Sequence, residues 1–283
     1  MSEEVLPATS PRDYARLLSE CSLNGELPLV VGGQGVNVWA LYFEDEEQGL
    51  EALGPFTSGD CDVVAGQDWL RAVAERTGLK YKIYKAGVAS PEVGMLVVPL
   101  PTGETMIQVL RNVKGVHIDQ VIDEALFVKL DEDTYRVMHP IVLLQAKLAN
   151  VLELPQKNRQ DIKHVKILCY CVRAFLRTQI DELMKGDLDA RECIGFMEWT
   201  AEVITSENAH KVAMEHGLSF SNIFPVESLP INAPQALVNF AEKRVPRLNI
   251  AADPDAEPIV SSSRSSNVIS PESASLPAQG QVL

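Results

Sequence analysis

The chain lacks the features of a membrane-spanning or disulfide-stabilised protein. Its longest apolar runs, such as residues 27–31 and 95–100, fall far short of the roughly 20 residues that a membrane helix needs. The first residues, MSEE, are acidic and contain no apolar stretch, so no secretory signal is predicted. The five cysteines, an odd number without a CxxC pair, fit small core residues of a reduced protein better than a disulfide framework. We therefore expect a cytoplasmic protein with no membrane partner.

Basic residues are scarce as well. The 25 Lys and Arg residues face 39 Asp and Glu residues, which gives a formal net charge of −14. Such a protein repels phosphate at long range, which disfavours a whole-surface nucleic-acid binder, and no DNA partner is expected. The imbalance is uneven, since residues 1–63 hold twelve acidic and two basic residues while residues 136–185 hold nine basic and four acidic ones. Two lobes with a polar cleft between them would give this pattern, and so would ordinary solvated helix faces.

Several catalytic motifs are missing. No GxxxxGK[ST] occurs, which excludes a P-loop ATPase as a motif, and no GxSxG surrounds Ser58 as in a nucleophile elbow. Four histidines occur singly, without the Cys/His cluster of a zinc site: His117, His139, His210 and His216. The three tryptophans fall at apolar helical positions and are predicted to lie in the core: Trp39, Trp69 and Trp199.

The order of predicted elements indicates an α+β fold. With 283 residues, 46% of them hydrophobic, the chain is long enough for a sizeable core and about two domains. We expect strands at 27–31, 61–64, 80–85, 94–100 and 104–110, and helices at 11–21, from residue 32, at 67–77, 139–153 and 158–183, with a helical pattern from residue 121 onward. Ser10, Pro11 and Asp13 are typical of a helix start, and Pro101-Thr102-Gly103 is typical of a hairpin turn.

The chain is predicted to divide into three parts. Residues 1–135 would form the sheet-containing core and residues 136–249 a helical domain. Residues 250–283 contain eight serines, four prolines and no aromatic residue. Such a segment cannot bury enough apolar surface to offset its ordering entropy, so a disordered tail is expected.

One pair of motifs carries chemistry. The segment VVGGQGVNVW places Gly32-Gly33 at a strand-to-helix turn, where backbone amides can approach a phosphate closely. The later segment TSGDCDVV places Asp60 and Asp62 two apart on a strand, so both carboxylates project from one face. Carboxylates this close repel each other and are best tolerated beside a divalent cation such as Mg²⁺. Each motif alone is weak, but their order and strand context together indicate phosphoryl or nucleotidyl transfer.

These residues resemble the signature of the DNA-polymerase-β-type nucleotidyltransferase superfamily, which consists of a strand, GG or GS, a helix, and DxD on the next strand. The resemblance covers roughly residues 25–180 and looks most like the small prokaryotic toxin-like members of the abortive-infection kind. It implies a nucleotidyltransferase core with a small mixed β-sheet and flanking helices, followed by an α-helical lobe. It also implies that Gly32 and Gly33 contact the phosphates of an NTP, and that Asp60 and Asp62 hold Mg²⁺, with Mn²⁺ as an alternative. Ser58 would add a hydroxyl contact to phosphate.

Two positions depart from this family pattern. The family's third carboxylate lies in a later strand, and the matching segment TMIQVL carries Gln108 there. Because the oxygen of Gln is uncharged, it would hold a second metal less tightly than a carboxylate would. Deprotonation of an acceptor hydroxyl would also be less favourable. Gln34 follows the glycine pair in place of the common Ser or Thr, and we expect it beside the nucleotide. Glu104 is not expected to replace the missing acid, because it lies some 13 Å along the strand at about 3.3 Å per residue.

The second part of the resemblance is the segment HPIVLLQAKLANVLELPQKNRQDIKHVKIL. Here Lys147 lies beside an apolar stripe formed by Ile141, Leu144, Leu148 and Val151. The resemblance implies that Lys147 reaches the triphosphate. An equally good interpretation is that Lys147 extends from a buried helix edge to solvent. Arg159 and Asp161 resemble a pair that positions the nucleotide in toxin-like members, although a plain intrahelical surface pair is the commoner arrangement. His164 could approach Asp161, but a surface histidine is the simpler expectation.

The leading hypothesis is therefore a Mg²⁺-dependent nucleotidyltransferase that binds ATP or another NTP. An acceptor hydroxyl would attack the α-phosphate and pyrophosphate would leave. The acceptor could be RNA, a protein or a small molecule, and residues 136–185 would offer a local basic surface for RNA. The rival is a catalytically degenerate nucleotide-binding protein of the same fold that acts through a partner. A third hypothesis is a toxin–antitoxin system, in which a cognate antitoxin blocks the protein.

Overall fold

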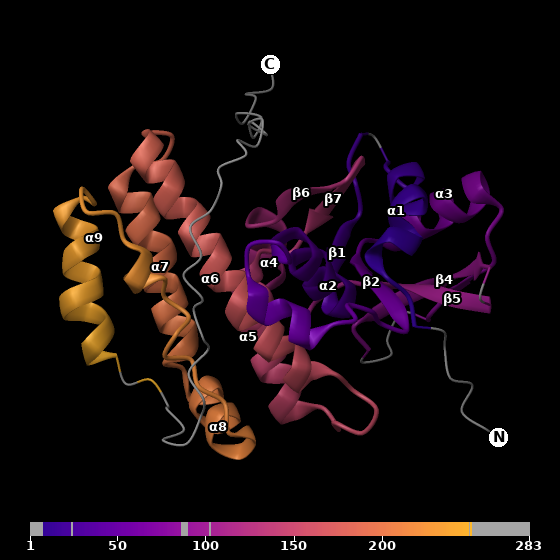
Figure 1. Cartoon of the computed structure of the whole chain (residues 1–283). Coiled ribbons are helices and arrows are strands. Elements are labelled where there is room, and N and C mark those ends of the chain that lie inside the picture. Colours follow the sequence, from indigo (N-terminus) through magenta and orange to yellow (C-terminus); the bar gives the residue numbers. More distant parts are fainter. Residues whose placement is uncertain (1–7, 24, 86–89, 102, 249, 251–283) are drawn as a thin grey trace.

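A seven-stranded mixed sheet and a group of helices make up the protein, which is seen here in a computed structural model that describes residues 8–23, 25–85, 90–101, 103–248 and 250 (Figure 1). The strands are β1 (Leu29–Val31), β2 (Asp60–Val64), β3 (Tyr81–Ile83), β4 (Glu92–Leu100), β5 (Gly103–Leu110), β6 (Leu126–Leu130) and β7 (Asp133–Val137). The helices among them are α1 (Pro11–Glu20), α2 (Gly32–Phe43), α3 (Gln67–Thr77) and α4 (Ile118–Asp123), with the 3₁₀ segment η1 (Gln48–Leu53). The helices after the sheet are α5 (Pro140–Glu153), α6 (Asp161–Lys185), α7 (Ala190–Ile204), α8 (Glu207–His216) and α9 (Gln235–Asn239). This mixed arrangement, with most helices after the strands, is consistent with the predicted α+β class.

The strand order places β1, β2 and β5, which lie far apart in the sequence, side by side in the sheet. The order is β3-β4-β5-β2-β1-β7-β6, in which β1 is antiparallel to β2 and parallel to β7, and β2 is parallel to β5. In the register of these pairs, Val31 lies opposite Asp62, and Asp62 lies opposite Gln108. The glycine turn after β1, the DxD motif and Gln108 are therefore neighbours.

The two faces of the central strands differ in character. Cys61 and Val63 of β2 are fully buried, and the side chains that alternate with them, Asp60 and Asp62, are only partly buried on the opposite face. Helix α1 covers the buried face, where the Tyr14 hydroxyl lies 2.7 Å from the Thr105 hydroxyl. The carboxylates are thus left on the face that looks away from α1.

Local sequence signals fix several element boundaries as expected. Ser10 caps α1 and accepts a hydrogen bond from the backbone of Arg12, while Asp13 accepts one from the Ser10 backbone in a capping box. Gly78 ends α3 in the left-handed conformation, with φ of 70°. All five cysteines are free and buried, which confirms their prediction as core residues.

The prediction of a helical pattern from residue 121 onward is wrong for residues 126–137. These residues form the hairpin β6–β7, in which Leu130 pairs with Asp133. Strand β7 also pairs in parallel with β1, about 100 residues earlier in the chain. Because this partner is so distant in the sequence, the local pattern of apolar residues does not reveal the strand. The predicted boundary at residue 135 falls inside β7.

Two further expectations differ in detail. The second long helix begins at Asp161 rather than at residue 158, because Asn158 adopts a φ of 64° that a helix does not allow. Trp199 is only partly buried, whereas Trp39 and Trp69 belong to the core. Thr102 of the predicted turn and residues 251–283 of the predicted tail lie outside the described residues.

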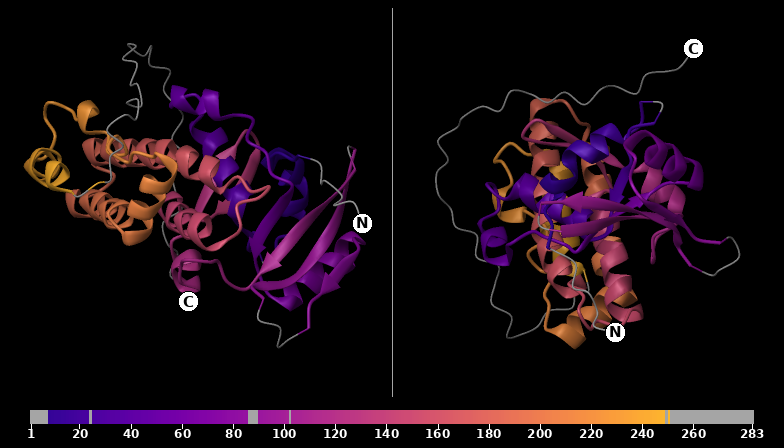
Figure 2. Two further views of the ribbon diagram at one scale, coloured as in Figure 1. Left: turned by 90° about the horizontal axis from the view of Figure 1, so that it is seen from below. Right: turned by 90° about the vertical axis from the view of Figure 1, so that its right-hand side faces the viewer.

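The sheet and the later helices occupy opposite ends of the molecule, with α5 and α6 between them (Figures 1 and 2). Helix α6 packs against α5 and α2, and it also contacts η1. Among the described residues, every helix is too short or too polar to traverse a lipid bilayer. Helix α5 brings the charge of Lys147 close enough to the sheet to act on Asp60 and Asp62.

Candidate functional site

The Asp62 carboxylate lies directly against the glycine turn. Gly32 has a φ of 63°, and a Cβ atom at this position would lie only 2.1 Å from Asp62 Oδ2. Any other residue would therefore be both strained and in collision with the carboxylate. Within the described part of the chain, no hydrogen bond or ion pair engages the Asp62 side chain, so its oxygens face the turn without a direct partner.

Asp60 is held by two polar neighbours. The amide Nε2 of Gln108 donates to Asp60 Oδ2 at 2.8 Å, and the Ser58 hydroxyl donates to Asp60 Oδ1 at 3.4 Å. Ser58 Oγ also lies 2.9 Å from the point where a Cβ of Gly33 would be. Gln108 thus donates a hydrogen bond to one carboxylate and adds no third negative charge to the pair.

The two strand carboxylates have raised pKa values. Burial raises the pKa of Asp60, while the Ser58 hydrogen bond and the positive charges of Lys147 and Arg159 oppose that shift. Burial, followed by the negative charge of Asp60, raises the pKa of Asp62 to about 7. The pair is therefore short of positive charge, despite the cations that act on it from a distance.

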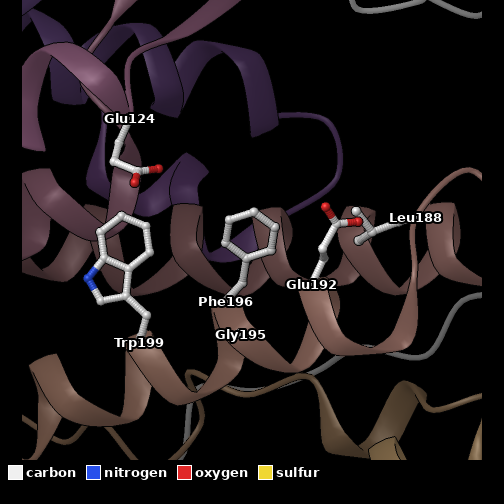
Figure 3. A pocket seen from close by; sticks show the side chains of 6 residues that line it. All are labelled: Glu124, Leu188, Glu192, Gly195, Phe196 and Trp199. Carbon is white, nitrogen blue, oxygen red and sulfur yellow. The ribbon is translucent and has the colours of Figure 1, made fainter. Parts of the chain in front are cut away.

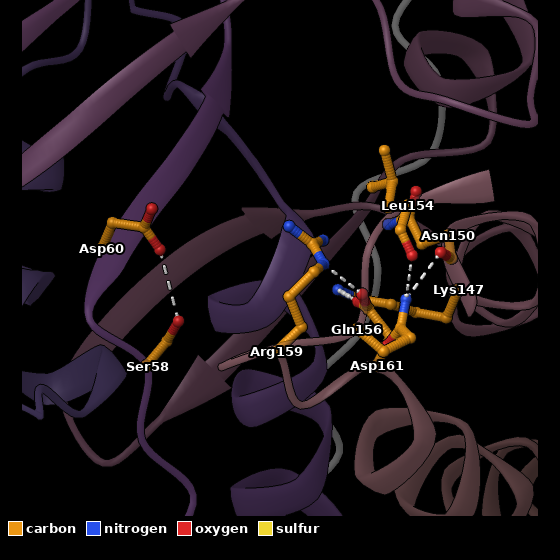
Figure 4. Close-up of polar contacts among 8 residues, drawn as sticks. All are labelled: Ser58, Asp60, Lys147, Asn150, Leu154, Gln156, Arg159 and Asp161. Carbon is orange, nitrogen blue, oxygen red and sulfur yellow. Dashed lines mark hydrogen bonds and ion pairs between the residues drawn. The ribbon is translucent and has the colours of Figure 1, made fainter. Parts of the chain in front are cut away.

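Another carboxylate near this site, that of Asp161, has its negative charge balanced by two cations in direct contact. Asp161 is only 2% exposed, and it accepts from Lys147 Nζ at 2.8 Å and from Arg159 Nε at 2.5 Å (Figure 4). Burial on its own would raise the pKa of Asp161, but the charges and hydrogen bonds of Lys147 and Arg159 outweigh it and lower the pKa to about 2. In Figure 4, Arg159 lies between the Asp161 cluster and the Ser58–Asp60 pair. The cluster of Lys147, Asp161 and Arg159 therefore forms a positively charged border to the carboxylate face.

These positions revise three expectations. Arg159 and Asp161 do not form a surface pair within one helix, because Asp161 is buried and Arg159 reaches it from the loop before α6. Lys147 does not extend to solvent, since it is 4% exposed and ends on Asp161. His164 is not a surface histidine, because it is 5% exposed and packs against Gly33, with Cε1 at 3.2 Å from a Cβ placed there. All three differences come from the packing of α6 on α2 and α5.

The side chain of Gln34, which is predicted to lie beside a nucleotide, points away from the carboxylates. It is 1% exposed, and its Nε2 donates to the Thr9 backbone oxygen at 3.0 Å while its Oε1 accepts from Asn37. Thr9 in turn is joined to Ser58, which accepts from the Thr9 hydroxyl at 2.7 Å through its backbone oxygen. Gln34 therefore supports the segment that leads into the DxD strand and does not face the carboxylates.

The basic segment is less available to a nucleic acid than its composition indicated. Four of its nine bases are engaged in ion pairs: Lys147 and Arg159 with Asp161, and Arg173 and Arg177 with Glu47. The Glu47 side chain is 2% exposed, and Arg173 beside it is 6% exposed. Part of the charge asymmetry between the two segments is thus neutralised inside the protein.

A pocket of about 240 Å³ lies between α7 and the end of α4 (Figure 3). It is lined by Glu124, Leu188, Glu192, Gly195, Phe196 and Trp199. The Trp199 ring stacks on His139 at a centroid distance of 4.8 Å, so the aromatic wall is anchored in the core. None of the lining residues belongs to the carboxylate face.

The donor set on the sheet suits Mg²⁺. In the described part of the chain, no three His, Cys, Asp or Glu side chains form a metal-binding group. The oxygen donors on this face are the carboxylates of Asp60 and Asp62, while Gln108 turns its amide nitrogen toward Asp60. Mg²⁺ is commonly bound by one or two carboxylates together with water and substrate phosphates. A carboxylate pair without a cation in direct contact, beside a glycine turn at the start of a helix, fits that mode of binding.

Two features of this site escape prediction from the sequence. His164 is expected at the surface, although its place three residues after Asp161 on a helix with a buried stripe could have indicated burial. Glu92 of β4 belongs to no motif, and its charge also raises the pKa of Asp62. Glu104 lies away from the site as expected, exposed and 3.9 Å from Lys80.

No family model matches the chain, and no curated protein matches it significantly. The functional argument therefore depends on the geometry of the residues described above.

Proposed function

We propose that the protein is a Mg²⁺-dependent nucleotidyltransferase that transfers NMP from an NTP to an acceptor hydroxyl. The observation that carries this proposal is the contact between the Asp62 carboxylate and the Gly32 turn, with Asp60 on the same strand face. It is the combination that a phosphate-bound metal requires, since the metal ligands and the phosphate-binding amides must lie within a few ångströms of each other.

Each group of this chain has a definite part in such a reaction. The backbone amides of Gly32 and Gly33, at the N-terminus of α2, would bind phosphate oxygens. Asp60 and Asp62 would hold Mg²⁺, which, when bound, neutralises charge on the phosphates and orients them. Lys147 and Arg159 would supply positive charge near the leaving pyrophosphate, with Asp161 fixing their positions.

The direct test is label transfer from each of the four α-labelled NTPs in the presence of Mg²⁺, with total RNA, protein and small-molecule hydroxyl acceptors. We expect Asp62→Asn to lower transfer at least about a hundredfold, because metal stabilisation of the phosphates contributes several kcal/mol. Asp68→Asn is the matched control, since it makes the same chemical change at a 99% exposed side chain on α3. Equal activity of wild type and Asp62→Asn would refute the proposal.

The position of Gln108 favours a second candidate, a nucleotide-binding protein of this fold without turnover. Its amide already satisfies Asp60 by a hydrogen bond and leaves no third acid to accept a proton. Under this alternative, wild type would bind NTP without transferring label, and Gln108→Glu would gain transfer. Loss of transfer in Gln108→Glu from an active wild type would favour the enzyme instead.

A toxin–antitoxin arrangement is a further proposal about context. It predicts growth inhibition on expression that disappears in Asp60→Ala, a change that removes one of the two proposed metal ligands. Inhibition that persists in Asp60→Ala would separate toxicity from the carboxylate site.

A further inference from the structure

His164 is buried without satisfying either of its ring nitrogens. The residue is 5% exposed, and Nδ1 and Nε2 are both inaccessible to solvent with no hydrogen-bond partner among the described residues. A buried polar atom without a partner costs about 1–3 kcal/mol, so native proteins rarely retain two on one ring without a reason. A missing ligand is one such reason.

The ring points its polar edge at the glycine turn. Its Cε1 atom lies 3.2 Å from the position of a Cβ on Gly33. Because Cε1 is bonded to both Nδ1 and Nε2, the edge that faces Gly33 is the one that carries both nitrogens. The Ser58 hydroxyl approaches the same point to 2.9 Å.

The surroundings of this edge favour an anion. Lys147 and Arg159 both act on His164 electrostatically and, after burial, help to lower its pKa to about 3, so the ring is neutral and has one N–H to donate. Asp161, the acid that acts on the ring, is already saturated by Lys147 and Arg159. Helix α2 begins at Gly32, so its N-terminus, which favours negative charge, lies beside the residue that the His164 ring contacts.

We propose that His164 donates a hydrogen bond to a phosphate oxygen of a polyphosphate chain that lies on the Gly32-Gly33 turn. This inference rests on the proposed function and adds to it a phosphate-binding residue from α6, on the helical side of the site. Ser58 and His164 then approach Gly33 from two elements, because a Cβ on Gly33 would lie 2.9 Å from Ser58 Oγ and 3.2 Å from His164 Cε1.

The test uses the full chain and inorganic tripolyphosphate with Mg²⁺, a probe that does not depend on the base. The ring C–H signals of the five histidines are followed by NMR during the titration. We expect the His164 signal to shift on saturation. The His139 signal should stay in place, because that ring is equally buried, also has a partnerless nitrogen, and lies against Phe175 and Trp199.

Two variants separate a ligand contact from a structural role. His164→Leu removes both partnerless nitrogens, so it should keep or raise the unfolding midpoint while weakening tripolyphosphate binding roughly tenfold to a hundredfold. His164→Gln retains a donor and should recover part of the affinity. Should the leucine variant fail to fold, the glutamine variant and the wild-type NMR titration still decide the question.

The outcomes distinguish this inference from the proposed function. If wild type binds tripolyphosphate in a manner that Asp62→Asn weakens, but the His164 signal and the affinity of His164→Leu do not change, then His164 is satisfied by buried water and the inference alone fails. If wild type binds neither tripolyphosphate nor any of the four NTPs, both fail.

Discussion

Asp161 is buried and Asp62 is partly buried near the same part of the sheet, yet their pKa values are displaced in opposite directions. Lys147 and Arg159 contact Asp161 and lower its pKa to about 2, whereas burial and the charge of Asp60 raise that of Asp62 to about 7. The first cluster is complete as it stands, and the second lacks a cation in direct contact. Asp161 is therefore part of the protein's structural framework, whereas the charged form of Asp62 would be stabilised by a bound cation.

The largest expected effect is the loss of the framework acid. Asp161→Ala leaves Lys147 buried without its partner, which should lower the free energy of unfolding by about 3–5 kcal/mol. Chemical denaturation monitored by circular dichroism measures this change. Asp68→Asn should leave the midpoint unchanged, and a loss of less than about 1 kcal/mol in Asp161→Ala would show that the two clusters do not differ as described.

The pH dependence of stability should carry opposite contributions from the two clusters. The raised pKa of Asp62 stabilises the fold below pH 4, and this contribution is lost as the pH rises toward about 7. The lowered pKa of Asp161 stabilises the fold above pH 4, and that contribution is lost as the pH falls toward about 2.

Asp62→Asn isolates the first contribution. Without Mg²⁺, its stability relative to wild type should grow by roughly 4 kcal/mol between pH 4 and pH 8, since the pKa of Asp62 is raised by about three units and each unit corresponds to about 1.4 kcal/mol. Added Mg²⁺ at pH 8 should stabilise wild type by a similar amount and should leave the stability of Asp62→Asn unchanged. A constant difference between the two proteins across this pH range would contradict the raised pKa.

A third carboxylate would sharpen the contrast further. Gln108→Glu replaces the donor to Asp60 by a negative charge, so the metal-free protein should lose about 2 kcal/mol of stability near pH 8. Added Mg²⁺ should stabilise this variant more than wild type. Thermal melts with and without Mg²⁺ test both statements, and equal Mg²⁺ responses would argue against a metal site at these residues.

The smallest expected effect comes from the glycine turn. Gly32→Ala forces an alanine into a left-handed conformation, at a cost of about 1–2 kcal/mol, and it displaces Asp62. The stabilisation by added Mg²⁺ should therefore be smaller in Gly32→Ala than in wild type. Gly195→Ala is the matched control, because a Cβ there meets nothing within 4 Å on helix α7, and it should be neutral or slightly stabilising.

Local sequence patterns are enough to predict several features of this fold. The capping box of α1, the glycine end of α3 and the placement of Asp60 and Asp62 on one strand face follow from neighbouring residues, so the order of residues is enough to predict them. The α+β class follows from the order of such segments. These features depend on interactions within a few residues, which a pattern records directly.

Contacts between distant residues, in contrast, depend on how the elements pack together. Strand β7 is stabilised by pairing with β1, Asp161 is buried by Lys147 from another helix, and the ring of His164 is aimed at Gly33 by the packing of α6. Each of these contacts joins residues that are far apart in the chain or on different elements, and its energy depends on burial and on the sum of nearby charges. The sequence named most residues of the site, but it could not tell a compensated carboxylate from an uncompensated one, because that difference exists only once the chain has folded.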